Sequence, residues 1–160
     1  MKSSIVLPDG ITKIEDYAFH NCTDLVSITI PPSVKTIGDL AFVNCINLIN
    51  VIMPKSISKI GVMAFAGCKK LTSIIIPENV TSIEPYTFYN CTALTSVTIP
   101  NSITSIGYQA FFNCSNLTSI NIPENIKFIE DWAFANCPNL KSIRIPSNII
   151  SIAETAFYSI

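Results

Sequence analysis

Charged residues are scarce in this 160-residue sequence, and their scarcity limits what the protein can bind. Only 13% of the residues are charged, against about 25% in an ordinary soluble protein. The formal net charge is −1, and no lysine or arginine lies between Lys70 and Lys127. Proteins that bind nucleic acid neutralise phosphates with a continuous basic surface. We therefore expect no nucleic-acid partner.

Residues suited to catalysis, cofactor binding or metal binding are also few. The sequence has a single histidine, His20, and its five glycines form no phosphate-binding loop. The adjacent carboxylates of Glu15–Asp16 and Glu130–Asp131 would diverge rather than meet at a substrate. Because an active site requires converging groups, we expect no enzymatic activity, no catalytic residue, no cofactor and no metal site.

Long apolar runs and targeting signals are missing as well. No run approaches the roughly 18–20 apolar residues that a membrane helix requires, so we expect no membrane insertion. The first residues lack the apolar segment of a signal peptide, and the last ones, Ala156–Ile160, carry no prenylation signal. From the sequence alone we expect either an intracellular protein or a part of a longer one, and the second interpretation is favoured.

Three residue types recur with one period of 23 residues. The periodic cysteines are Cys22, Cys45, Cys68, Cys91, Cys114 and Cys137; Pro8, Pro31, Pro54, Pro77, Pro100, Pro123 and Pro146 keep the same spacing, as do Phe19, Phe42, Phe65, Phe88, Phe111, Phe134 and Phe157. An unbroken period of this length indicates a solenoid in which each repeat is one coil. The sequence predicts one domain, residues 1–160, with seven coils from about residue 5 to 157 and no capping units.

One repeat, residues 71–93, shows how a coil is built. Ile74 and Ile76 flank Ile75, and this alternation predicts a short strand with one buried side. Proline cannot donate to a sheet ladder, so each strand ends at the proline that follows it. Parallel strands are expected around residues 27–30, 50–53, 73–76, 96–99, 119–122 and 142–145. At the ~4.8 Å spacing of strands, seven coils span about 30–35 Å.

The other side of the coil carries a second apolar pair, Val80 and Ile83. The segment Tyr-Thr-Phe-Tyr-Asn-Cys that follows suits a single turn of 3₁₀ or α-helix, which leads back to the next leucine. No coil can bury its apolar side chains alone, so the stack is stable only as a whole.

The repeat L-x-x-I-x-I-P-x-x-V-x-x-I-x-x-x-A-F-x-x-C resembles the BspA-like class of leucine-rich repeats. This class differs from the commoner leucine-rich consensus, because Ser or Asn, as at Ser33 and Asn79, directly precedes the apolar position. The resemblance covers nearly the whole chain. It implies a right-handed solenoid with a concave parallel sheet and with short strands, turns or 3₁₀ segments on the convex face. It also implies adhesion or binding of host or extracellular-matrix proteins, at a cell surface or after secretion.

The cysteine column has a structural interpretation and a chemical one. Side chains stacked about 4.8 Å apart and pointing the same way are poorly placed for a disulfide, whose Cβ atoms converge to about 3.8 Å. A column of thiols cannot form a tetrahedral metal site either. We therefore expect six reduced, buried thiols in one internal column.

Glycosylation acceptor triplets occur at Asn21, Asn79, Asn90, Asn113 and Asn116. The repeat itself generates most of them, so they are weak signals of modification.

The outward side of the predicted sheet is the candidate binding surface. Its columns are mostly Ser and Thr, with an apolar corner where the isoleucines gather. The candidate partner-binding residues are Ile49, Ile52, Thr72, Ser73, Ile75, Thr95, Ser96, Thr98, Thr118, Ser119, Asn121 and Arg144. Ser and Thr also suit a strand merely for solubility, so a scaffold fragment without a dedicated site is the alternative to a protein-binding or adhesion module.

The ends of the stack carry a further prediction. Ile5, Leu7 and Ile11 begin the apolar pattern at one end, and Ala156 and Phe157 close it at the other. Open apolar layers and unpaired strand edges attract other chains. We expect either that these coils are a piece of a longer array or that they associate end to end.

Overall fold

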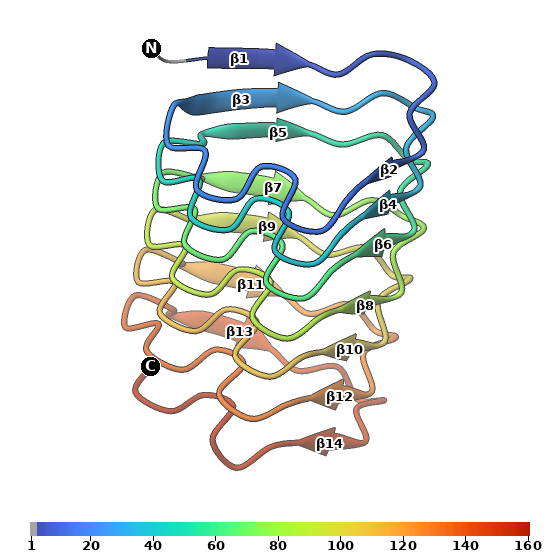
Figure 1. The fold of residues 1–160 in the computed structure, drawn as a ribbon. Coiled ribbons are helices and arrows are strands. Elements are labelled where there is room, and N and C mark those ends of the chain that lie inside the picture. The colour runs from blue at the N-terminus through green and yellow to red at the C-terminus, as the bar shows by residue number, and fades with distance from the viewer. Residues whose placement is uncertain (1–2) are drawn as a thin grey trace.

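The chain winds into seven right-handed coils stacked in sequence order (Figure 1). The structure is a computed structural model that describes residues 3–160, so the first two residues of the predicted domain lie outside the described part. Each coil contributes one longer strand to one side and one two-residue strand to the other. This architecture confirms the predicted leucine-rich-repeat-type solenoid.

The longer strands form one side, and all their pairings are parallel. They are β1 (Ser3–Val6), β3 (Leu25–Thr29), β5 (Asn50–Ile52), β7 (Ser73–Ile75), β9 (Ser96–Thr98), β11 (Ser119–Asn121) and β13 (Ser142–Arg144). Partners such as Ser27 and Asn50, or Ser73 and Ser96, are 23 residues apart. The six predicted strand positions are thus confirmed, and β1 adds a seventh strand.

The opposite side carries strands of two residues each, also in parallel register. They are β2 (Lys13–Ile14), β4 (Thr36–Ile37), β6 (Lys59–Ile60), β8 (Ser82–Ile83), β10 (Ser105–Ile106), β12 (Phe128–Ile129) and β14 (Ser151–Ile152). In β8 the inward residue is Ile83, the second member of the apolar pair that the sequence places on this side.

The predicted helical turn is wrong, because the described residues contain no helix. In the fourth coil, the amides of Tyr86, Phe88 and Asn90 donate to carbonyls of the next coil. The intervening amides, of Thr87, Tyr89 and Cys91, donate to the carbonyl three residues earlier. A helix would direct every amide along its own axis, whereas here alternate amides join neighbouring coils.

This turn requires two residues in the left-handed conformation, four positions apart. Tyr86 has φ 60° and Asn90 has φ 58°, and the pattern recurs in other coils. Asn and Gly adopt this conformation at least cost. The position directly before the cysteine is Asn or Gly in six coils: Asn21, Asn44, Gly67, Asn90, Asn113 and Asn136. Backbone conformation therefore explains why asparagine precedes each cysteine other than Cys68.

The core is built from columns of identical side chains. Phe42, Phe65, Phe88, Phe111 and Phe134 are fully buried, and successive rings stack in near-parallel orientation with most centroids 5.1–5.4 Å apart. Beside them runs the cysteine column. Each thiol from Cys45 to Cys137 donates to the carbonyl of the phenylalanine 26 residues earlier, for example Cys91 Sγ to Phe65 O at 3.1 Å.

The junction between the third and fourth coils is looser than the others. In the described part of the chain, pairing is missing on both sides of this junction, between β5 and β7 and between β6 and β8, whereas between the fifth and sixth coils only the β9–β11 pairing is missing. The Phe65–Phe88 centroid distance also rises to 5.8 Å. Thr87 is buried in the fourth coil where the other coils have alanine. We attribute the wider spacing to this bulkier side chain, whose hydroxyl donates to Glu84 O at 2.7 Å.

Candidate binding surface

The alternation of each longer strand places its side chains alternately in the core and in solvent. In β7, Ile74 is buried between the exposed Ser73 and Ile75, and β9 and β11 show the same pattern. We call the outward side of the strands β3 to β13 the strand face. Its residues come from consecutive coils, so the stacking of coils positions them in columns.

The strand face holds every residue that the sequence proposed for partner binding. All twelve are exposed: Ile49, Ile52, Thr72, Ser73, Ile75, Thr95, Ser96, Thr98, Thr118, Ser119, Asn121 and Arg144. They lie within or directly before five successive strands, β5 to β13. Their placement on one surface agrees with the alternation in the sequence, and their role in binding remains a prediction.

Three isoleucines make this surface unusual for a solvent-exposed sheet. Ile49, Ile52 and Ile75 have exposed fractions of 46%, 53% and 70%; together they are called the isoleucine patch. Ile52 and Ile75 occupy equivalent positions on the neighbouring strands β5 and β7 (Figure 1). A recess lies between these two strands, which do not pair with each other, and it is lined by both isoleucines together with Asn50, Met53 and their neighbours. An apolar patch beside a recess is typical of a contact surface.

The charges of the strand face lie at its margins. Arg144 forms an exposed ion pair with Glu124 at 3.2 Å. Lys69 and Lys70 lie in the turn that leads to β7, and Lys55 lies three residues after the end of β5. The face itself is neutral between these margins, so its hydroxyl groups can form hydrogen bonds without selecting partners by charge.

Burial favours the protonated form of the interior thiols. Burial raises the pKa of Cys45 to about 12 and of Cys137 to about 11. It holds the pKa of Cys68, Cys91 and Cys114 well above the usual range. Because the thiolate is the nucleophile and the metal ligand, these five side chains are suited to packing. Cys22, in the first coil, is only partly buried.

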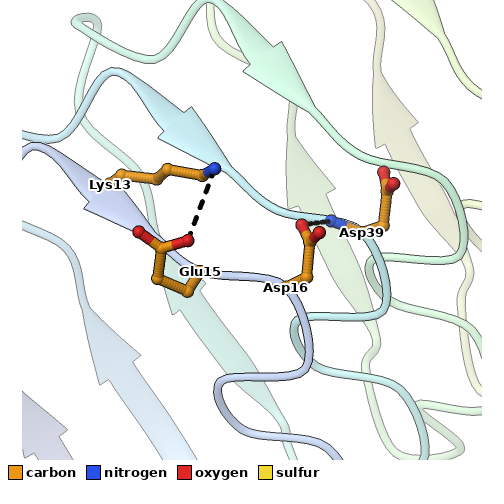
Figure 2. A network of polar contacts seen from close by, with 4 residues as sticks. All are labelled: Lys13, Glu15, Asp16 and Asp39. Carbon is orange, nitrogen blue, oxygen red and sulfur yellow. Dashed lines mark hydrogen bonds and ion pairs between the residues drawn. The ribbon is translucent and has the colours of Figure 1, made fainter.

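Glu15, Asp16 and His20 make local contacts in and beside the turns. Glu15 contacts Lys13 at 3.4 Å, while Asp16 accepts a hydrogen bond from the Asp39 amide at 2.8 Å (Figure 2). Asp39 accepts one in turn from the Val62 amide. Asp16 and Asp39 thus link successive coils, whereas Glu15 forms an ion pair within its own coil. His20 lies 2.9 Å, through Nδ1, from the carbonyl oxygen of Tyr17 and is exposed.

The turns also carry an aromatic cluster that the sequence interpretation missed. Tyr86 contacts Tyr89 and Tyr108 edge to face at 5.8 and 5.3 Å, and Tyr89 stacks on Phe112 at 5.4 Å. The pKa of Tyr86 is raised, mainly because the side chain is partly buried and to a smaller extent because Tyr108 lies beside it. The signal in the sequence was the 23-residue spacing of Tyr89 and Phe112.

Two general features complete the description of residues 3–160. No group of three or more histidine, cysteine, aspartate or glutamate side chains in this range could hold a metal ion. The same range contains no helix of the length and apolarity that crossing a membrane would take.

Comparison with known protein families and solved structures identifies relatives of this fold. The BspA type leucine rich repeat region matches residues 2–96 and 81–160, with six copies. A leucine-rich repeat protein of T. pallidum superposes with a TM-score of 0.87 and 33% identity, over 91% of this chain and 71% of that one. No curated protein matches the chain by sequence.

Two further solved structures are longer, and this chain spans about half of each. A leucine-rich repeat protein from Bacteroides ovatus has 30% identity and a TM-score of 0.70, over 91% of this chain and 46% of that one. A leucine rich cell surface protein from Faecalibacterium prausnitzii has 32% identity and a TM-score of 0.67, over 88% and 46%. Repeat proteins of this kind are generally non-enzymatic and use their extended surfaces for protein interactions. The chain therefore belongs to the BspA-type leucine-rich repeat family.

Proposed function

We propose that the chain is a non-enzymatic protein-binding module of cell-surface type, which adheres to host or extracellular-matrix proteins through the strand face. The observation that carries the proposal is the isoleucine patch on an otherwise neutral, hydroxyl-rich sheet. Exposed apolar side chains of this size favour burial against a partner. The related protein from F. prausnitzii is a cell surface protein, which supports the location.

The test is binding of purified matrix proteins, such as collagens, laminin and fibronectin, to the immobilised chain. The variant Ile52→Glu/Ile75→Glu should weaken binding at least tenfold, because it places two charges where a partner would bury apolar area. Phe128→Glu is the matched control, since Phe128 is 42% exposed but lies in β12 on the opposite side. Circular dichroism should show that both variants remain folded.

Each outcome decides between the candidate functions. If a matrix protein binds and the double variant binds equally well, the strand face is the wrong surface, and Tyr86 and Trp132 on the turns become the next candidates. If the wild-type chain binds none of the proteins, the scaffold interpretation replaces the adhesion module.

A second proposal concerns the two ends of the stack, where we expect association between chains. In the last coil, Ile145, Ile152 and Ile160 are 36%, 40% and 51% exposed, although their equivalents in the coil before, Ile122, Ile129 and Cys137, are buried. In the first coil, Ile5 and Leu7 are only partly buried. Each end offers the surface that an interior coil buries against its neighbour, so a second copy can continue the stack. Light scattering at micromolar concentration should show assemblies larger than one chain, and a stable monomer would refute this proposal.

A further inference from the structure

Positive charge without compensating negative charge is concentrated in one part of the solenoid. Residues 40–77 contain four lysines and no aspartate or glutamate, although the whole chain carries a net charge of −1. The lysines are Lys55, Lys59, Lys69 and Lys70, and all four are exposed. The ion pairs found among the described residues, Lys13–Glu15 and Arg144–Glu124, include none of them. The isoleucine patch lies within the same segment.

Two of these lysines adjoin the patch. Lys69 and Lys70 lie in the turn before β7 and are separated from that strand by Leu71 and Thr72. Lys70 is five residues from Ile75, which is at most about 17 Å along the chain. Lys55 follows β5 at the other end, but Glu78 occupies the equivalent position one coil further on. Lys59 lies in β6, on the opposite side of the solenoid. The charge that borders the patch therefore comes mainly from Lys69 and Lys70.

Within residues 3–160, no carboxylate occupies the columns of Lys69 and Lys70 in either adjoining coil. The equivalent positions in the adjoining coils are Ile46 and Asn47 on one side and Thr92 and Ala93 on the other. The nearest acidic residue in these two columns is Asp24, two coils away, or about 10 Å at the spacing of parallel strands. That separation equals roughly one Debye length at 0.1 M salt, so the field of Lys69 and Lys70 extends outward to a partner.

The junction between the third and fourth coils adds a place for a side chain. The recess between β5 and β7 is lined by Asn50, Val51, Ile52, Met53, Ser73, Ile74 and Ile75. It opens where strand pairing between these coils is interrupted. The surface around β5 and β7 thus combines the isoleucine patch, a recess and two neighbouring lysines.

We infer that the partner element bound here is an extended, acidic protein segment, in which carboxylates lie over Lys69 and Lys70 and large apolar side chains cover the isoleucine patch. The inference rests on the proposed function and specifies the partner's chemistry. Complementary charge orients the segment and speeds its encounter with the surface, while apolar burial supplies the affinity. The neutral hydroxyl columns of β9 and β11 would give no such preference.

Three synthetic heptapeptides provide the probe, added to the whole chain and followed by amide NMR shifts. The first is Glu-Asp-Thr-Leu-Thr-Phe-Thr; the second replaces the acidic pair with Lys-Arg; the third retains the acids and replaces Leu and Phe with Ala. The first should shift the amides of Ile49, Ile52, Lys70 and Ile75, and should bind at least fivefold more tightly than either of the others. Raising the salt concentration from 50 to 500 mM should reduce this advantage over the basic peptide.

The variant Lys69→Glu/Lys70→Glu should weaken binding of the first peptide at least fivefold. Lys59→Glu/Lys127→Glu is the control with the same change in net charge, placed on or beside the short-strand side, and it should bind as the wild type does. Equal binding of the acidic and basic peptides, no effect of the Lys69/Lys70 variant, or no shifts at 2 mM peptide would each overturn the inference. If the peptide experiments overturn the inference but a matrix protein still binds through Ile52 and Ile75, the proposed function remains valid and only the acidic character of the partner is rejected.

Discussion

The phenylalanine column makes a quantitative prediction, because the same substitution can be compared in the middle and at the end of the stack. Phe88 is fully buried and stacks on two rings, Phe65 at 5.8 Å and Phe111 at 5.2 Å. Phe157 is only partly buried and stacks on one, Phe134 at 5.4 Å. Replacing a buried phenylalanine by alanine costs about 3–5 kcal/mol, and an aromatic pair contributes about 0.5–1.5 kcal/mol beyond burial.

We therefore expect Phe88→Ala to lower the free energy of unfolding by about 4 kcal/mol, since it removes both full burial and two stacked contacts. Phe157→Ala should cost roughly half as much, because less area and one contact are lost. Urea unfolding, monitored by circular dichroism, measures both free energies. If Phe88→Ala does not fold, the milder variants Phe88→Leu and Phe157→Leu can be compared instead. Equal losses at the two positions would refute the argument that each ring is stabilised from both sides.

Four other predictions address the thiols, the turn and the loose junction. Titration of the unfolded chain under non-reducing conditions should count six thiols, and four or fewer would reject the free-thiol column. Because burial raises the pKa of the interior thiols, the stability that they contribute is present below about pH 8.5, where unfolded thiols ionise, and should decline as the pH rises toward 12. Asn136→Ala should cost about 1–2 kcal/mol, since alanine is strained in the left-handed conformation, whereas Asn136→Gly should cost about a few tenths of a kcal/mol; equal losses in thermal unfolding would contradict this account. Thr87→Ala should shorten the Phe65–Phe88 spacing from 5.8 Å toward that of the other rings, and a crystal structure with the distance unchanged would show that Thr87 is not the cause.

The features that could be predicted from the sequence are those that repeat identically. Ile74 and Val97 are inward and Ser73 and Ser96 outward, because alternation along a strand follows directly from backbone geometry. The buried phenylalanines and cysteines follow from their period, since a column of identical apolar side chains can pack only inside the stack.

The features that could not be predicted depend on individual residues or on backbone conformation. Tyr86 and Trp132 adopt positive φ although bulky residues rarely do, so composition gives no sign of the turn, and a helical turn was expected instead. The loose junction, which we attribute to Thr87 in place of alanine, is seen only in the spacing of neighbouring coils.

The hydrogen bond from each thiol to a carbonyl 26 residues earlier has a consequence for how proteins of this family change in length. The distance equals one repeat of 23 residues plus the three that separate phenylalanine from cysteine within a coil. Adding or removing one whole repeat therefore recreates the same bond between new neighbours, whereas a shift of one residue would place a different side chain opposite every carbonyl at that point. Duplication of genetic segments in units of 69 nucleotides (3 × 23) can thus lengthen the array without inventing a new contact. Relatives of which this chain spans 71% or 46% can differ from it simply in the number of coils.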